Sequence, residues 1–173
     1  MLIRLAVETD LTAIVEIYNA AIPTRLATAD LEPVSVESRH DWFKSHSDRY
    51  PVWVITNDEN SVEKNIENDQ KIIGWLSLQM FYGRVAYHKT AEVSIYIAPA
   101  YQGKGIGKRL LDHAIAICPK LNITKLVGFV FAHNAASCSL FKSFGFEQWG
   151  FLPQVAELDS IEQSLIILGK LVY

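Results

Sequence analysis

The most informative segment of the sequence is Glu92–Arg109, EVSIYIAPAYQGKGIGKR. Its first part, Glu92–Ile97, is rich in β-branched and aromatic residues and predicts a strand, which ends before Pro99. Three glycines then alternate with other residues: Gly103, Gly105 and Gly107. A helix is predicted to begin near the second glycine and to end at Pro119. Its apolar positions form a single stripe, at Ile106, Leu110, Leu111, Ala114, Ile115 and Cys118.

A glycine loop that opens a helix is suited to holding a pyrophosphate. Glycines let the backbone approach a ligand closely, and the helix start directs unpaired N–H groups and a positive dipole end to the same place. Lys104, Lys108 and Arg109 add positive charge. The spacing fits neither G-x-G-x-x-G with a downstream acidic residue nor the glycine-lysine-hydroxyl ending of the P-loop. A flexible turn without a ligand is the alternative interpretation.

The flanking sequence predicts one mixed α/β domain over residues 1–173. Helices are expected from Asp10 to near Asn19, from Ser35 onward, and over Asn134–Phe144, closed by Gly145. The acidic segment Asn57–Lys71 is expected to be a solvated, mobile connection, and Phe81–Thr90 a linker. The remaining strands are predicted at Leu2–Ala6, Pro51–Thr56, Ile72–Met80, Leu126–Phe131, Phe146–Phe151 and Leu165–Leu171.

Composition excludes several classes of protein. The chain has 173 residues, 50% of them hydrophobic, and a formal net charge of -3, which argues against a general nucleic-acid binder. No apolar run reaches the roughly 18 residues of a membrane span, and charged residues near Met1 argue against a signal peptide. Cys118 and Cys138 are too few for a disulfide scaffold, and no Cys/His cluster has zinc-ligand spacing. We therefore expect a cytoplasmic protein without a metal.

Two motifs together resemble the GNAT acetyltransferase superfamily. Gln102–Gly107, QGKGIG, resembles the Q/R-x-x-G-x-G/A loop of that family. Asn134–Ser137 and Phe144–Gly145–Phe146 resemble its later N-x-x-S and G-F signature. The order of elements also matches over nearly the whole chain. The resemblance implies a mostly antiparallel sheet of about six to seven strands flanked by about four helices, with acetyl-CoA as cosubstrate.

A narrower resemblance is to the phosphinothricin and methionine sulfoximine acetyltransferase branch. It is carried by Ile17–Asn19, Glu32–Ser35 and Thr90–Ile97. This branch implies a homodimer and a set of cofactor contacts. The backbone of Ile95, Tyr96 and Ile97 would contact the pantetheine arm. The loop residues Gly103, Lys104, Gly105, Ile106, Gly107 and Lys108 would hold the pyrophosphate, and Asn134 would contact the cofactor beside it. It also implies an amino-acid pocket lined by Tyr82, Gly83, Arg84, Glu92, Val93 and Ser94.

The chemistry of amine acetylation assigns roles to some of these residues. An amine attacks a thioester only when neutral, and Glu92 is the predicted proton acceptor, with a surface carboxylate at a strand entry as the alternative. Arg84 would clamp a substrate carboxylate, or else is a solvated loop arginine. Many family members place a tyrosine four residues before the glycine of the G-F pair, where this chain has Phe141. Proton delivery to the leaving thiolate by that side chain is therefore in doubt, and His133 is only a weak substitute.

The sequence thus predicts an acetyl-CoA-dependent N-acetyltransferase. The acceptors implied by the resemblance are phosphinothricin, methionine sulfoximine and methionine sulfone, acetylated on the α-amine by direct transfer. Two alternatives stay open: acetylation of a protein N-terminus or a polyamine, and a non-catalytic CoA-binding module.

Overall fold

The computed structural model describes residues 1–57 and 71–173. Seven strands form one sheet in the order β1-β2-β3-β4-β5-β7-β6. Every neighbouring pair is antiparallel except β4 and β5, which are parallel. The strands are β1 (Leu2–Leu5), β2 (Val52–Thr56), β3 (Ile72–Met80), β4 (Thr90–Ile97), β5 (Lys125–Phe131), β6 (Glu147–Leu158) and β7 (Ile161–Leu171). The predicted mixed α/β architecture is confirmed.

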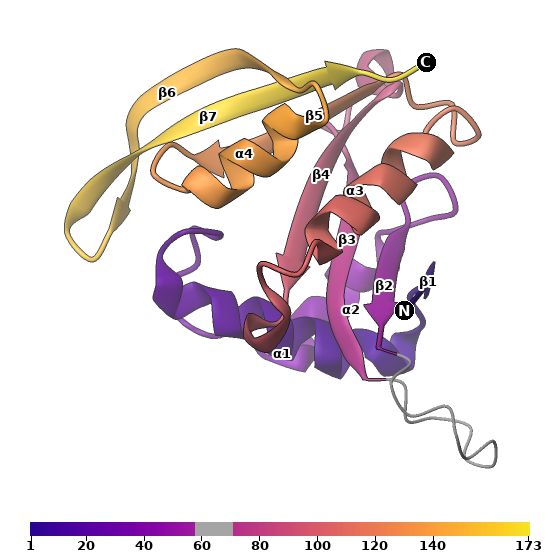
Figure 1. Cartoon of the computed structure of the whole chain (residues 1–173), viewed down its shortest axis with the longest axis horizontal. Helices are drawn as coiled ribbons and strands as arrows, with labels where there is room; N and C mark the ends of the chain where they lie inside the picture. Colours follow the sequence, from indigo (N-terminus) through magenta and orange to yellow (C-terminus); the bar gives the residue numbers. More distant parts are fainter. Residues whose placement is uncertain (58–70) are drawn as a thin grey trace.

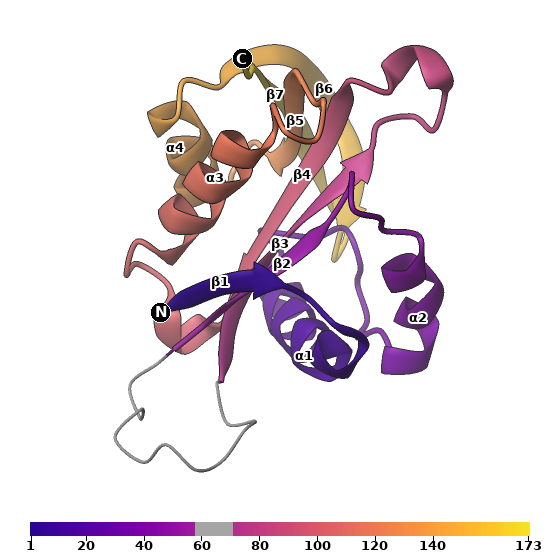
Figure 2. The same cartoon turned by 90° about the vertical axis from the view of Figure 1, so that its right-hand side faces the viewer.

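Helices cover both faces of this sheet unevenly. Helices α1 (Leu11–Ala21) and α2 (Val36–Lys44) lie on one face, and α3 (Ile106–Ile117) and α4 (Ala135–Ser143) lie on the other (Figures 1 and 2). In both views α1 and α2 lie against the β1–β4 half, so no helix within residues 1–57 or 71–173 covers β5, β7 and β6 on that face. None of the helices in the described ranges is long and apolar enough to cross a membrane.

The core follows from the apolar periodicities. The buried stripe of α3 packs against β2–β5 together with α4, and a smaller cluster joins α1 to β2 and Trp75. Helix α4 begins as predicted, because Asn134 Oδ1 accepts the Ser137 N–H at 3.0 Å. It ends at Gly145, whose φ of 76° is the left-handed conformation expected after a helix.

The C-terminal hairpin differs from the prediction. The sequence indicated strands at Phe146–Phe151 and Leu165–Leu171, whereas β6 and β7 continue to a tight turn at Asp159–Ser160. Both turn residues have positive φ, 51° and 65°, as the favoured two-residue hairpin turn requires. Without glycine the turn gives a weak signal, and register shifts between Gln148 and Gly150 and between Leu152 and Ala156 interrupt the alternation of β6.

Three further expectations concern the start of β4 and the two segments that were expected to lack regular structure. Strand β4 begins at Thr90, two residues before the predicted start at Glu92. The linker over Phe81–Thr90 contains a short 3-10 turn at Val85–Tyr87. The expected mobile connection, Asn57–Lys71, lies outside the described residues except for its two ends.

Candidate active site

Strands β4 and β5 separate after a short parallel ladder. Their pairing covers only Thr90–Glu92 against Lys125–Val127. Beyond it, β4 continues to Ile97 while still paired with β3, and β5 continues to Phe131 while paired with β7. The facing edges of the two strands are therefore unpaired over this length, which we call the β4–β5 split. Unpaired edge groups can bind an extended ligand as an additional strand would.

The backbone groups that face the split can be identified from the hydrogen-bond alternation. The Ala98 N–H donates to Ile73 O at 3.0 Å, so Ala98 faces β3. Backbone groups of alternate residues point the same way along a strand, so those of Val93, Ile95 and Ile97 face the split. Tyr96 differs from its neighbours, because its backbone faces β3 and its hydroxyl donates to Ala27 O at 3.0 Å. Its polar groups are thus already engaged.

The glycine loop lies at the Ile97 end of the split. Gly103 and Gly105 have φ of 73° and 77°, which side chains rarely adopt, and a Cβ at either position would meet nothing within 4 Å. Backbone conformation rather than crowding therefore requires glycine here. Gly105 precedes the first turn of α3, whose leading N–H groups have no partner within the helix. Lys104 and Lys108 are exposed beside this loop, and buried Ile106 anchors it to the core. Gly107 packs closely instead, since a Cβ would lie 3.1 Å from Leu140 Cδ2.

The second motif lies at the end of β5. Asn134 is buried; besides capping α4, its Nδ2 donates to Leu26 O at 2.9 Å. One amide hydrogen of Asn134 is left for a ligand. Because β4 and β5 are parallel, the loop before α3 and the start of α4 both lie at the open end of the split (Figure 1).

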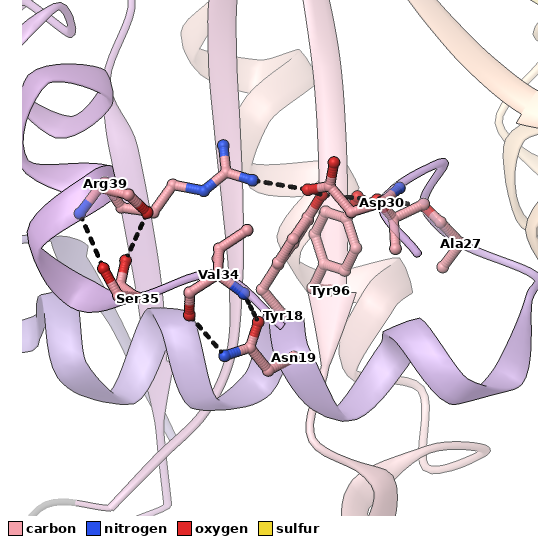
Figure 3. Close-up of polar contacts among 10 residues, drawn as sticks. Tyr18, Asn19, Ala27, Asp30, Val34, Ser35, Arg39 and Tyr96 are labelled. Carbon is pink, nitrogen blue, oxygen red and sulfur yellow. Dashed lines mark hydrogen bonds and ion pairs between the residues drawn. The ribbon is translucent and has the colours of Figure 1, made fainter. Parts of the chain in front are cut away.

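Residues 25–34 connect α1 to α2 and are held against several distant elements; we call this segment the strap. Arg25 forms a two-pronged ion pair with Asp159 at the hairpin turn, with N–O distances of 2.7 and 2.9 Å. His133 Nε2 lies 2.9 Å from Arg25 O. Together with the bonds from Asn134 and Tyr96, these contacts hold the strap across the β4–β5 split, from β4 to the hairpin. Figure 3 shows the part of the strap next to Tyr96.

Glu92 occupies the point where β4 and β5 separate. It is partly buried and pairs in register with Gln79 of β3 and Val127 of β5, and its side-chain carboxylate accepts no hydrogen bond from any described residue. Burial raises the pKa of its carboxyl above the ordinary range. Side chains alternate along a strand, so Glu92, Ser94 and Tyr96 face α1 and α2, while Val93 is buried toward α3.

The other predicted pocket residues lie on the β3–β4 loop. Tyr82, Gly83 and Arg84 are exposed. The Arg84 backbone carbonyl accepts the Tyr87 N–H at 3.0 Å, whereas the Arg84 guanidinium forms no hydrogen bond or ion pair with a described residue. The loop emerges at the Glu92 end of β4, beside an open cavity of about 450 Å³. That cavity is lined by Phe81, Ala86, Tyr87, His88, Lys89, Thr90, Lys125, Val127, Trp149 and Ile167. Thr90 and Val127 place it next to Glu92, whereas Tyr82, Gly83 and Arg84 are not among its lining residues.

Sequence reasoning missed a second group of residues near Glu92. A smaller cavity of about 150 Å³ lies beneath α1 and α2, and Arg39, Trp42, Ser77 and Gln79 are among its lining residues. One signal was available: Ser77 and Gln79 are polar residues two apart in an otherwise apolar strand. The strap contacts of Arg25 gave no comparable signal, because their partners are more than 100 residues away.

Phe141 and His133 offer no obvious acid for a leaving thiolate. Phe141 is buried, and its ring packs against Gly128 of β5. His133 is engaged with the strap. The described residues include no group of three or more His, Cys, Asp or Glu side chains that could hold a metal.

The split, the glycine loop and the unpaired carboxylate are features suited to an enzyme with an extended, phosphate-bearing cosubstrate. Comparison with known proteins agrees. The acetyltransferase (GNAT) family model matches residues 13–146, and the chain belongs to this family. It is an N-acetyltransferase, and acetyl-CoA is its acyl donor.

Individual relatives narrow the comparison. The chain is 46% identical over 170 residues to a Bacillus subtilis (strain 168) protein provisionally named a phosphinothricin acetyltransferase, with 98% of each chain covered. It is 33% identical to the L-methionine sulfoximine/L-methionine sulfone acetyltransferase of Salmonella typhimurium (strain LT2), covering 90% of this chain and 85% of that one. A phosphinothricin acetyltransferase from Sinorhizobium meliloti, solved in complex with acetyl-CoA, superposes with a TM-score of 0.88 at 26% identity, covering 99% and 88% of the two chains.

Proposed function

We propose that this chain acetylates the α-amine of small amino-acid analogues, with methionine sulfoximine, methionine sulfone and phosphinothricin as acceptors. The observation that carries the proposal is the position of Glu92, an unpaired, partly buried carboxylate where β4 and β5 separate. A thioester held along the split ends near this carboxylate. The names of the relatives support the acceptor class.

The cosubstrate would be held mainly by backbone. Free groups of Ile95 and Ile97 suit the amides of the pantetheine arm, and the Gly103–Lys108 loop suits the pyrophosphate. Ile97 O already accepts from Gln102 Nε2 at 3.2 Å, so its N–H is the freer group. Asn134 would contribute its remaining amide hydrogen. Tyr96 would act through its side chain, which holds the strap, rather than through a cofactor contact.

Transfer would be direct, without a covalent enzyme intermediate. Glu92 takes a proton from the acceptor ammonium, and the neutral amine adds to the thioester carbonyl, forming the C–N bond. The Val93 and Ile95 N–H groups face the split and are placed to donate to the resulting oxyanion. The C–S bond then breaks, and the thiol, with an ordinary pKa near 8.5, can leave as thiolate without an acid at Phe141. The extra proton left on the new amide nitrogen passes to this thiolate or to solvent, which gives the neutral amide and free thiol.

The acceptor would lie on the α1–α2 side of β4. Ser94 projects to this side next to Glu92, whereas Val93 contributes only backbone. The Arg84 guanidinium has no hydrogen-bonding partner among the described residues and is suited to clamp the α-carboxylate, with Tyr82 and Gly83 beside it on the same loop.

Thiol release from acetyl-CoA tests the proposal. Methionine sulfone, methionine sulfoximine, phosphinothricin, spermidine and a short peptide are compared in parallel. Turnover with the amino-acid analogues alone is the expected result. Turnover with spermidine or the peptide alone would support the alternative acceptors, and tight CoA binding without turnover would support a non-catalytic binding module.

We also infer that residues 1–173 act as one domain that dimerises in the cytoplasm. Strands from both ends of the chain share one sheet, which supports a single unit. No helix of the described residues covers β5, β7 and β6 on the α1–α2 side (Figure 2). Phe129 follows Gly128, which packs against α4, and Trp149 packs on Gly169, which follows core residue Leu168, so both aromatic residues lie on the uncovered side and are exposed. Such a patch suits a second copy. The free thiols of Cys118 and Cys138 suit a reducing compartment. Light scattering after size-exclusion chromatography measures the oligomeric state.

A further inference from the structure

The smaller cavity beneath α1 and α2 has the size of one amino-acid side chain. Its volume is about 150 Å³, and it lies between those helices and the β3–β4 pair. A cavity of this volume in another protein holds benzene. The side chains of methionine sulfone, methionine sulfoximine and phosphinothricin each have as many non-hydrogen atoms as benzene. The lining is formed by Ile14, Val15, Tyr18, Val34, Arg39, Trp42, Trp75, Ser77, Gln79, Ser94 and Tyr96.

The cavity combines aromatic walls with unused polar groups. Trp75 stacks on Tyr96 with ring centroids 4.6 Å apart, and Trp42 meets Trp75 edge-on at 5.7 Å. Next to Trp75 and Tyr96 on the same face of β3 and β4, the side chains of Ser77, Gln79 and Ser94 form no hydrogen bond with any other described residue. Polar side chains in a partly enclosed space normally find partners, so these three are available to a ligand. An apolar stem with a polar head matches this arrangement.

The positive charge of Arg39, a lining residue of the cavity, is neutralised by Asp30. Arg39 lies over the Tyr18 ring, 4.8 Å from its centroid, and donates one hydrogen bond to Asp30 at 2.8 Å. Figure 3 shows this pair, with another guanidinium nitrogen pointing away from Asp30. Asp30 also accepts the Tyr18 hydroxyl at 2.6 Å. The pair therefore offers N–H donors without a net positive charge.

The cavity adjoins the proposed base. Ser94 lies two residues after Glu92 on the same face of β4, and Gln79, which also lines the cavity, is the register partner of Glu92. An acceptor whose amine reaches Glu92 can thus extend its side chain along β3 and β4 toward Arg39.

We propose that this cavity is the subsite for the acceptor side chain, and that the Arg39–Asp30 pair makes it select neutral heads over anionic ones. This inference rests on the proposed function. A sulfone or sulfoximine is neutral and accepts hydrogen bonds from Arg39, Ser77 and Gln79. A phosphinate of the same shape loses hydration of its charge in this cavity, and the Arg39 charge that would compensate for the loss is already paired with Asp30. The wild-type enzyme is expected to have a higher kcat/KM for methionine sulfone than for phosphinothricin.

Two substitutions of opposite sign test the selectivity. Asp30→Asn keeps the shape and leaves Arg39 unbalanced, so the phosphinothricin-to-sulfone ratio of kcat/KM should rise about tenfold. Arg39→Gln removes the positive charge and should lower the same ratio. Asp41→Asn removes an exposed charge from the same helix and should change the ratio less than about twofold. Thermal unfolding of each variant establishes that it is folded.

The results of these assays test the proposed subsite and the proposed function separately. Opposite shifts for the two variants, with an unchanged ratio for Asp41→Asn, are the expected result. Acetylation of amino acids with ratios unmoved, or moved the same way by both variants, would overturn the subsite while leaving the proposed function intact. A wild-type enzyme that acetylates no amino acid would overturn both.

Discussion

Replacing Glu92 by glutamine removes the proposed base without removing a structural contact. Glutamine has nearly the same shape, and Glu92 has no hydrogen-bond partner among the described residues that the change could orphan. General-base catalysis contributes about 10²- to 10⁴-fold. The expected fall in kcat is therefore of this size, or about 2.7 to 5.4 kcal/mol in activation free energy. Binding of acetyl-CoA should not change, because the split and the glycine loop are intact.

Stability should move in the opposite direction from activity. Burial raises the pKa of Glu92 in the folded state, so the folded protein binds this proton more tightly than the unfolded chain. Stability is therefore lost as pH rises from the unfolded-state pKa through the folded-state pKa. Glu92→Gln should raise the melting temperature at pH 7 and converge with the wild type below about pH 4. A merely misfolded variant would show lower stability instead.

The assay is thiol release over a range of pH with saturating acetyl-CoA. In the wild type, kcat/KM for the acceptor should fall on the acid side as Glu92 becomes protonated, and this limb should be missing from the variant. Glu147→Gln, an exposed change on β6, is the matched control and should stay within about twofold. A Glu92→Gln enzyme that keeps wild-type turnover and the acid limb would refute the assignment of the base.

Three further substitutions address the loop, the strap and the fold. Gly105→Ala forces a side chain into the left-handed region at a cost of about 1–2 kcal/mol and should raise the KM for acetyl-CoA about tenfold, with calorimetry of CoA binding as the check. Arg25→Lys keeps the charge but loses the two-pronged bond to Asp159; it should raise the acceptor KM several-fold with acetyl-CoA binding unchanged, and equal acceptor kinetics would argue against a positioning role. Burial opposes ionisation of Asp10, but hydrogen bonds from Arg4 and the Val7 N–H together lower its pKa. Asp10→Asn should cost about 1–2 kcal/mol at pH 7 in denaturant unfolding, a deficit that shrinks as pH falls through the lowered pKa of Asp10.

Most of the fold could be predicted because its signals are local. The apolar stripe of α3, the cap at Asn134 and the left-handed Gly145 each depend on neighbouring residues, and each appears where the sequence indicated. The C-terminal hairpin could not be delimited in the same way. Its turn uses Asp159 and Ser160 rather than glycine, and β6 carries irregularities that only its pairing with β7 reveals.

The candidate site likewise combines groups that lie close together in the sequence with groups that lie far apart. Apart from the Asn134 amide, the groups proposed to hold the cosubstrate are backbone atoms of one continuous stretch, so the sequence from Ile95 to Lys108 indicates them directly. Of the groups proposed to hold the acceptor, Tyr82–Arg84, Glu92 and Ser94 were indicated by the sequence. The others come from α1, α2, β3 and the strap, which the fold brings together across long separations. Trp42 and Arg39 carry no motif of their own, and only the folded chain places them beside Ser94.

The strap connects the two groups of residues, and its sequence can therefore affect specificity for the acceptor. The strap contacts both the proposed cosubstrate side and the proposed acceptor side of the site. Asn134 and Tyr96 donate hydrogen bonds to its backbone carbonyls, and Asp30, farther along the strap, forms an ion pair with Arg39. Backbone carbonyls tolerate changes of side chain, so substitutions within the strap can change the acceptor cavity while the anchoring bonds persist. Relatives that share the glycine loop can therefore differ in acceptor. The residue to compare first is the one at position 30, since it decides whether the arginine opposite it offers a neutral or a positive mouth to the side chain of the substrate.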